Sequence, residues 1–432
     1  MKNPKKLWKK AKKIIPGGNG LLSKRPERYS PNHWPTYYKS SKGVFIKDLN
    51  GKKYLDMAQM GMGTCVAGYA NNYIDNIVKK NISKGVNSTL NSFEEFDLAR
   101  KILKFDRFAD QVKFARGGGE AMALAIRVAR AETNKEKILF SGYHGWHDWY
   151  LAANILDKDN LNQHLLKGLD PLGLPKNLKN SSVGFEYNNV DELKNISKRN
   201  VAAIVIESCR YSYPQKNFIE NINRICKEKK ICLIVDEITS GWRIKPGGIY
   251  NKLGIKPDIV VYGKALGNGY AISAVVGKKK YLLNAERSFM SSTAWTERVG
   301  FSAANGLIDF FVKNKIHNHI DRLGRKVLFG WKNIAKKYDL KLTTSKIPHL
   351  CTFFLKYENN ETLYTYFTNE MLKKNILASN SMYLSYGHKE KHIKEYLVAC
   401  DHIFKKMKEK ILNKDKFKNL KPRFQGFSRL TK

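Results

Sequence analysis

The chain has 432 residues, with 78 Lys and Arg against 38 Asp and Glu and a formal net charge of +40. This length suits one large α/β unit with a smaller second domain. No segment reaches the roughly 18 consecutive apolar residues of a membrane span, which excludes a helical membrane protein. The lysine-rich segment 1–15 lacks the apolar stretch of a signal peptide, so we expect a cytoplasmic protein.

The positive charge raises nucleic acid or an anionic membrane surface as partners. It is spread along the chain, however, and no nucleic-acid-binding signature accompanies it. Dispersed lysine is typical of a solubilising surface. We therefore expect no specific nucleic acid and no membrane as partner, only non-specific binding to polyanions at low salt. The six cysteines show neither C-x-x-C pairs nor metal-ligand spacing, so we expect reduced thiols and no metal site.

The first predicted element is a hairpin over 43–57, around the dipeptide Asn50-Gly51. From about residue 72, helical patterns alternate with short apolar runs, which predicts a mostly parallel sheet with helices on both faces. The helical patterns span 94–103 and 120–131, and the apolar runs span 138–140, 202–206, 231–235 and 259–262. After about residue 310 come a long amphipathic helix and then strand and helix patterns at 350–357 and 391–408. We expect a large domain over 72–310, and a small domain formed by 1–71 and 311–432 and ending in a basic tail.

Two of the apolar runs each lead to one charged residue, Asp236 and Lys264. In open α/β sheets, ligands bind at the carboxyl ends of the strands. A carboxylate and an amine at that edge suit pyridoxal phosphate, since the lysine forms the Schiff base and the acid holds the pyridinium nitrogen. The alternative is a solvated surface lysine and a helix-capping aspartate. The segments around Lys264 carry few charges, which favours a buried amine with a lowered pKa.

Two further segments suit a cofactor. Three glycines, 117–119, follow a strand-like run and precede a helical one, so their N–H groups could bind a phosphate at the positive end of the helix dipole. The alternative is a tight turn. The aromatic and histidine cluster 143–149 could supply a ring to stack on the cofactor and polar groups to orient it, or could be a packed surface loop. No carboxylate or cysteine stands at metal-ligand spacing from its histidines.

Four motifs occur in the order and spacing of class III PLP-dependent aminotransferases. They are FARGGGEA at 114–121, YHG at 143–145, DEITSG at 236–241, and PD at 257–258 leading to GK at 263–264. From about residue 15 to 388 the chain most resembles the glutamate-1-semialdehyde 2,1-aminomutase branch of that family. The resemblance implies pyridoxal phosphate as cofactor and a homodimer with shared active sites. It also implies an α/β chain of PLP-dependent transferase fold type I, with a mostly parallel seven-stranded sheet and a smaller α+β domain.

The resemblance further implies the role of single residues. Lys264 is the Schiff-base lysine and moves the substrate proton, and Asp236 keeps the pyridine nitrogen protonated. The remaining residues are expected to contact the cofactor. They are Tyr143 and Ile238 on the two ring faces, His144 and Glu207 at the cofactor's side, Gly118 and Gly119 on the phosphate, and Thr293 of the partner subunit on the same phosphate.

Some positions depart from the family pattern. Glu207 is followed by Ser-Cys-Arg-Tyr instead of Pro and the Gly-Asn segment of aminomutases, and the phosphate turn is Gly-Gly-Gly instead of Ser-Gly-Thr. The loop 294–298 and the segment 22–27 also differ from those of aminomutases. These changes preserve the cofactor chemistry and question the aminomutase substrate. The pattern is closer to a subgroup associated with surface-polysaccharide and nonulosonic-acid sugar pathways.

The function expected is amino-group transfer between a small-molecule amino donor and a carbonyl acceptor. One alternative is intramolecular amine migration, as in an aminomutase. Another is a catalytically silent, basic polyanion-binding protein, against which the intact Lys264 and Asp236 argue.

Three arginines are candidates for binding a substrate carboxylate: Arg25, Arg210 and Arg298. A guanidinium can bind a carboxylate through two parallel hydrogen bonds. The alternative for Arg210 and Arg298 is a structural ion pair with carboxylates such as Glu207 and Glu297.

Overall fold

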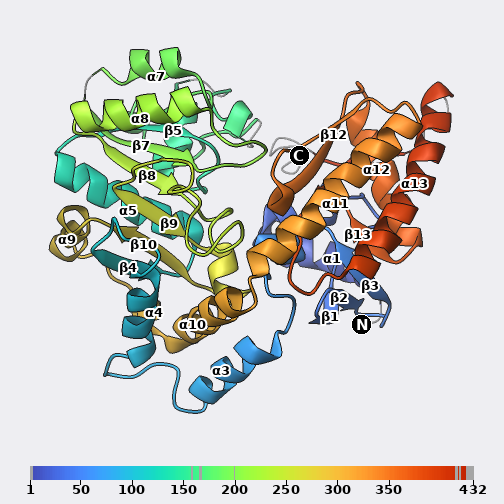
Figure 1. Ribbon diagram of the computed structural model, residues 1–432, viewed down its shortest axis with the longest axis horizontal. Helices are drawn as coiled ribbons and strands as arrows, with labels where there is room; N and C mark the ends of the chain where they lie inside the picture. Colours follow the sequence, from blue (N-terminus) through green and yellow to red (C-terminus); the bar gives the residue numbers. More distant parts are fainter. Residues whose placement is uncertain are drawn as a thin grey trace. The chain divides into compact units, whose positions relative to one another are not determined.

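The computed structural model describes residues 3–156, 159–164, 168–198, 200–413, 417 and 420–424. These residues form two compact units (Figure 1), a smaller one of residues 3–71 and 315–424 and a larger one of residues 72–314. Most of the predicted basic tail lies outside the described residues. Within the described part of the chain, no helix is long and apolar enough to cross a membrane.

The larger unit is built on a seven-stranded sheet of order β4-β10-β9-β8-β7-β5-β6 (Figure 1). Its strands are β4 (Gln111–Ala115), β5 (Lys137–Ser141), β6 (Ser182–Gly184), β7 (Val201–Glu207), β8 (Cys232–Asp236), β9 (Ile259–Tyr262) and β10 (Ser273–Gly277). The pairs from β9 to β6 are parallel, and only β10 runs antiparallel to its neighbours in this sheet. The predicted α/β class with a mostly parallel sheet is confirmed.

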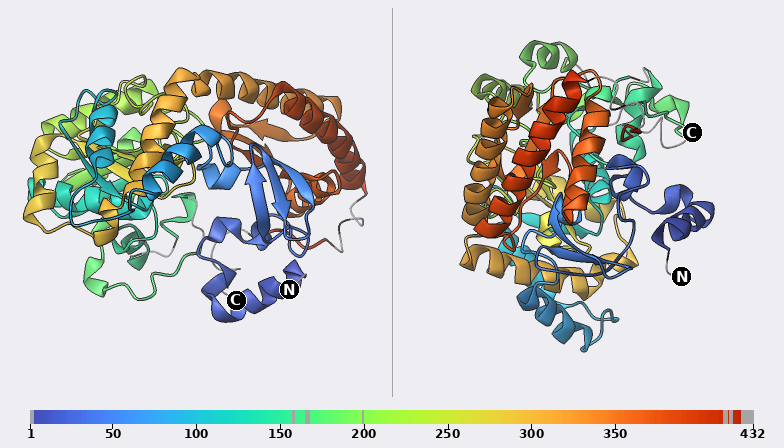
Figure 2. Two further views of the ribbon diagram at one scale, coloured as in Figure 1. Left: turned by 90° about the horizontal axis from the view of Figure 1, so that it is seen from below. Right: turned by 90° about the vertical axis from the view of Figure 1, so that its right-hand side faces the viewer.

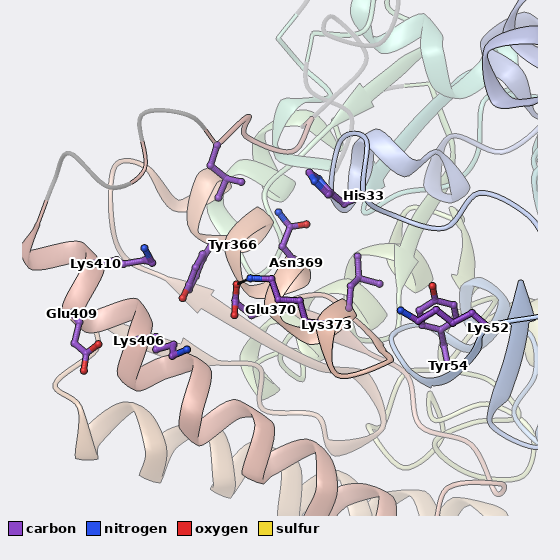
Figure 3. Close-up of a pocket in the computed structure, with 12 residues that line it drawn as sticks. His33, Lys52, Tyr54, Tyr366, Asn369, Glu370, Lys373, Lys406, Glu409 and Lys410 are labelled. Carbon is purple, nitrogen blue, oxygen red and sulfur yellow. Dashed lines mark hydrogen bonds and ion pairs between the residues drawn. The ribbon is translucent and has the colours of Figure 1, made fainter. Parts of the chain in front are cut away.

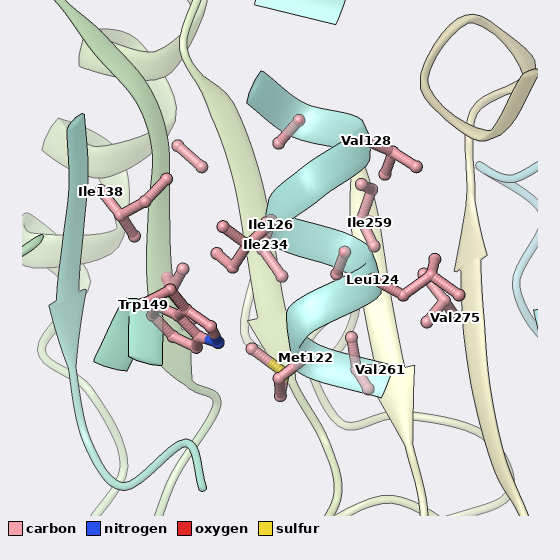
Figure 4. Close-up of a cluster of buried hydrophobic side chains, with 14 of the residues drawn as sticks. Met122, Leu124, Ile126, Val128, Ile138, Trp149, Ile234, Ile259, Val261 and Val275 are labelled. Atoms are coloured by element: carbon pink, nitrogen blue, oxygen red, sulfur yellow. The ribbon is translucent and has the colours of Figure 1, made fainter. Parts of the chain in front are cut away.

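The larger unit has helices that pack on its sheet and helices that pack on other helices. They are α3 (Asn72–Ile82), α4 (Phe93–Leu103), α5 (Gly118–Thr133), α6 (Asp148–Leu151), α7 (Val190–Ile196), α8 (Lys216–Glu228), α9 (Lys279–Arg287) and α10 (Arg298–Lys313). Figure 4 shows how α5 packs its apolar side chains, such as Leu124 and Ile126, against Ile234, Ile259 and Val275 of the strands. All residues of β7, β8 and β9 are buried, which explains their continuous apolar runs.

The smaller unit contains two sheets, of order β1-β2-β3-β13 and β11-β12-β14. The strands are β1 (Tyr38–Lys42), β2 (Phe45–Asp48), β3 (Lys53–Met57), β11 (Leu342–Thr344), β12 (Cys351–Leu355), β13 (Ile376–Ala378) and β14 (Ser381–Met382). The helices are α1 (Pro4–Ile14), α2 (Met60–Gly63), α11 (Ile316–Lys337), α12 (Asn360–Lys373) and α13 (Glu390–Leu412), and Figure 2 shows α11 and α13 side by side. Antiparallel pairing of β2 with β3 confirms the hairpin predicted around Asn50-Gly51.

Candidate active site

The candidate site lies at the carboxyl ends of three neighbouring strands of the larger unit. Glu207 ends β7 and Asp236 ends β8, and the two residues stand opposite each other in the parallel ladder. The next strand, β9, leads through Gly263 to Lys264, the first residue of the short 3₁₀ helix Lys264–Gly267. The sheet therefore places the two predicted catalytic residues, Asp236 and Lys264, at the carboxyl ends of adjacent strands.

Asp236 is almost fully buried, with 4% of its surface exposed. Its Oδ2 lies 2.8 Å from Nδ1 of His144, and its Oδ1 accepts a hydrogen bond of 2.9 Å from the backbone N–H of Ile238. The other ring nitrogen of His144 lies 3.3 Å from the carbonyl oxygen of Ser141. His144 thus links the carboxylate to the end of β5 and fixes its direction. A buried carboxylate held in this way suits the pairing of a protonated ring nitrogen.

Lys264 is partly buried, and its amine donates a hydrogen bond of 2.8 Å to Oγ1 of Thr239. Burial, and then the positive charge of Arg210, lower the pKa of Lys264 to about 8. A neutral amine is therefore readily available as a nucleophile near pH 8. The backbone φ of Lys264 is 41°, in the left-handed region. Such strain is common at functional sites. A residue in the left-handed region directs its side chain differently from a residue in extended conformation.

The N-terminus of α5 offers a place for an anion. Gly118 and Gly119 open the helix after the N-cap Gly117, so their N–H groups lie in the first turn, which has no intrahelical acceptors. A Cβ on Gly118 would come within 3.0 Å of Cδ1 of Ile238. Ile238 therefore contacts the glycine turn, and glycine is the residue that leaves room for it. Ile238 thus contacts both predicted parts of the site. Its side chain lies against Gly118, and its backbone N–H binds the carboxylate of Asp236.

Tyr143 and Glu207 are joined directly. The backbone N–H of Tyr143 donates to Oε2 of Glu207 at 3.2 Å, and the Tyr143 ring meets Tyr150 edge-on with 6.1 Å between ring centroids. Glu207 is 6% exposed, and its other oxygen accepts a hydrogen bond of 2.6 Å from Arg210. These contacts hold Tyr143 beside Glu207, at the same carboxyl ends of the strands where Asp236 lies.

Thr293 is exposed, and it opens the 3₁₀ turn Thr293–Thr296. Two residues beside the glycine run hold this turn and were missed by the sequence analysis. Arg116 donates to the carbonyl oxygens of Ala294 and Trp295 at 2.7 and 3.0 Å, and Oε1 of Glu120 accepts from Nε1 of Trp295 at 2.9 Å. Both belong to the FARGGGEA motif, which was the available signal.

The three candidate arginines differ in their surroundings. Arg210 forms the ion pair with Glu207 that was the structural alternative, at 2.6 Å. Arg298 also forms a structural ion pair, at 3.3 Å, and its partner is Glu94 instead of the example Glu297. The cause is that α10 begins at Arg298 and directs its side chain towards α4, whereas Glu297 caps the same helix. Arg25 belongs to the smaller unit, where it lies against Gly17.

A cavity of about 440 Å³ lies beside the ends of β5 and β7. Its lining includes both partners of the Glu207–Arg210 ion pair together with Tyr187, Asn188 and Tyr211. A cavity of about 820 Å³ in the smaller unit is lined by lysines of α12 and α13 and by Lys52 of the hairpin (Figure 3), and it contains none of the predicted site residues. Of these two cavities, the first adjoins the site.

Arg210→Ala separates the two interpretations of this arginine. If Arg210 binds a substrate carboxylate, its loss removes a charge-assisted hydrogen bond, and KM for acidic substrates is expected to rise about 10- to 100-fold. KM for neutral amines and the melting temperature would change little. Loss of a structural ion pair would instead lower the melting temperature and impair every substrate alike. Arg224→Ala, which breaks the exposed pair with Glu228, is the matched control.

The comparisons with known proteins agree with this fold. The sequence profile of the family Aminotransferase class-III matches residues 28–373. The chain belongs to the class-III aminotransferase family, and its fold is that of PLP-dependent transferases, fold type I.

Named relatives cover most of the chain. Glutamate-1-semialdehyde 2,1-aminomutase of Nitrosopumilus maritimus is 32% identical over 437 residues, 93% of this chain and 99% of that protein. The 3-aminobutyryl-CoA aminotransferase of Cloacimonas acidaminovorans is 32% identical over 331 residues, 74% of this chain and 75% of that protein. Among solved structures, the FumI protein of Sphingopyxis, in a form with bound PLP, has a TM-score of 0.85 at 23% identity and covers 97% of this chain and 98% of its own.

Proposed function

We propose that this enzyme transfers an amino group between a small-molecule amino donor and a carbonyl acceptor, with Lys264 and Asp236 as its catalytic pair. The observation that carries the proposal is that two reactive groups lie at the carboxyl ends of neighbouring strands. One is an amine whose pKa is lowered to about 8, and the other is a buried carboxylate held by His144. Family membership supports an enzyme over the catalytically silent alternative.

The cofactor is pyridoxal phosphate, and the residues at the strand edge fit it. Lys264 offers the reactive amine, Asp236 an anion for the ring nitrogen, and the first turn of α5 N–H groups for the phosphate. When bound, the cofactor withdraws electrons from the substrate carbon and carries the amino group between donor and acceptor.

The side chains of this chain supply the remaining steps. With the cofactor bound, the amine of Lys264, which Thr239 holds in place, would act as the base that takes the proton from the substrate carbon and as the acid that gives it back. Asp236 stabilises the proton on the ring nitrogen, and His144 keeps the carboxylate oriented. Tyr143 and Ile238 would contact the two faces of the ring.

Amine migration within one molecule is the second candidate, favoured by the aminomutase of Nitrosopumilus maritimus, which matches nearly the full chain. Against it, Arg210 and Tyr211 replace the Gly-Asn segment and line the cavity beside Glu207. The sugar acceptor suggested by the sequence stays a proposal. Two tyrosine rings in the lining of this cavity, Tyr187 and Tyr211, support it, since such rings can pack on a sugar.

The direct test uses the holoenzyme and one substrate class at a time. Candidate amines are added singly, and loss of the absorbance of the lysine-bound cofactor identifies the donor. Keto acids and keto sugars are then added to the bleached enzyme, and return of the absorbance identifies the acceptor. Incubation with glutamate-1-semialdehyde alone tests the aminomutase. Turnover of that compound without a second substrate would overturn the transferase proposal.

A homodimer with shared sites is supported by an exposed apolar patch on the larger unit. We define the patch as Leu90, Phe93 and Phe96, which are 81%, 70% and 63% exposed. Exposed apolar groups of this size together mark an interaction surface. Arg298, which follows the turn of Thr293 in the chain, pairs with Glu94, a residue of α4 next to Phe93 in sequence. The cytoplasmic location stays a prediction.

Mixing two inactive variants tests the shared site. In a heterodimer of Thr293→Ala and Lys264→Ala chains, one site loses both groups and the other keeps both. Random assortment is expected to restore roughly a quarter of the wild-type sites. Activity is measured after mixing, with mass spectrometry or differential tagging to show that heterodimers form. Heterodimers without recovered activity would show that Thr293 serves the site of its own chain.

A further inference from the structure

His147 lies against the N-terminus of α5 and has no role in the site as described so far. A Cβ built on Gly119 would stand 2.9 Å from both Cε1 and Nδ1 of the His147 ring. Helical Cα–Cβ bonds tilt towards the helix N-terminus. The edge of the imidazole therefore occupies the space that a side chain at position 119 would fill, beside the free N–H groups of the first turn.

The loop that carries His147 is closely packed against this turn. Gly145 has a φ of 109°, and a Cβ there would come within 3.0 Å of the Cα of Gly119. His147 is itself the N-cap of α6, and its ring lies 4.6 Å from that of Trp146. Because two glycines, Gly119 and Gly145, permit the approach, the position of the imidazole is built into the fold.

The Nδ1 atom of His147 is buried and makes no hydrogen bond within the described part of the chain. Buried polar atoms nearly always have a partner. Burial lowers the pKa of His147, while the charges of Glu120 and Asp148 raise it. Oε1 of Glu120 is already bound to Trp295, and its Oε2 accepts from the N–H groups of Arg116 and Gly117. An anion bound at the helix terminus would supply the partner that Nδ1 lacks.

We propose that the imidazole of His147 donates a hydrogen bond from Nδ1 to the phosphate of the cofactor, as the side-chain donor that the Gly117–Gly119 run lacks. The inference rests on the proposed function, because it requires the phosphate at the N-terminus of α5. His147 is a binding residue here, and the chemistry at Lys264 does not need it.

Cofactor affinity tests the proposal without an activity assay. Apo-protein is titrated with pyridoxal phosphate and, in parallel, with pyridoxal, which lacks the phosphate. His147→Ala is expected to raise the dissociation constant for pyridoxal phosphate about 10- to 100-fold, the range of one charge-assisted hydrogen bond. The constant for pyridoxal should stay unchanged. His33→Ala, which removes an exposed histidine of the smaller unit, is the control and should alter neither constant.

A second variant excludes a merely structural effect. Gly119→Ser alone should weaken pyridoxal phosphate binding, because its Cβ meets the imidazole. Combined with His147→Ala, the same serine has room and offers a hydroxyl in the imidazole's place, so the double variant should regain most of the affinity.

Three results would count against the proposal. Unchanged affinity of His147→Ala for pyridoxal phosphate, equal weakening of both ligands, or no recovery in the double variant would each overturn the role of His147. If the wild-type protein binds neither ligand, the proposed function itself fails.

Discussion

Lys264→Ala is expected to abolish turnover and the covalent labelling of the protein by borohydride in the presence of pyridoxal phosphate. The reason is that labelling needs a neutral amine at the strand edge, and Lys264 supplies it with a pKa lowered to about 8. The labelled peptide is identified by mass spectrometry of a digest. The variant should stay folded, since within the described part of the chain the lost side chain donates a hydrogen bond to Thr239 and forms no ion pair.

Lys245→Ala is the matched control for this variant. Burial also lowers the pKa of Lys245, which lies in the same unit and bonds to Asn251. Its loss should leave labelling and turnover intact. Persistent labelling of another lysine in the Lys264→Ala protein would show that the cofactor is held elsewhere.

Asp236→Ala is expected to lower kcat by a factor on the order of 10² or more. Without the carboxylate, the proton on the cofactor nitrogen is no longer stabilised, and electrons leave the substrate carbon less easily. Steady-state kinetics at saturating substrate and saturating cofactor measure the effect. Asp236→Asn should show a similar loss, because the amide can keep the contact with the N–H of Ile238 and carries no charge.

Two comparisons guard this result against an effect on folding. Removing a buried group that pairs with His144 can cost about 1–3 kcal/mol of stability, so the melting temperatures of both variants are compared with wild type. Asp191→Ala, which removes a 92% exposed carboxylate of α7, should leave kcat unchanged. A normal kcat in the folded Asp236→Asn protein would mean that another group pairs with the ring nitrogen.

The strands that carry the site could be predicted from the sequence because burial leaves a local record. β8 and β9 are buried on both faces, so their runs contain no polar residue before Asp236 and after Asp258. The hairpin was equally visible in Asn50-Gly51. Strand β10, inserted antiparallel between β9 and β4, was not predicted. The strands with which β10 pairs are far from it or adjacent to it in sequence, and no local pattern distinguishes these partners from others.

The contacts within the site were less predictable than the residues themselves. The motifs pointed to Asp236 and His144 separately, but their mutual bond joins positions 92 residues apart. The pairing of Arg298 with Glu94 spans a still longer stretch of chain, and the sequence suggested only the neighbouring Glu297 as an example of a partner. Nor does any local pattern show that the ring of His147 fills the space beside Gly119. Such contacts depend on how separate elements pack against each other, and the spacing of residues in the sequence does not reveal this packing.

The placement of Asp236 and Lys264 has a consequence for how such a site can change over evolution. Their strands are neighbours in one hydrogen-bonded ladder, and adjacent strands keep a separation of about 4.8 Å whatever their loops contain. The residues around the neighbouring cavity, such as Arg210 and Tyr211, instead follow the end of β7 and are free of that ladder. Substitutions there can exchange one substrate for another while the distance between the reactive groups is preserved. In this architecture, the substrate specificity can therefore diverge while the catalytic residues and their positions stay the same.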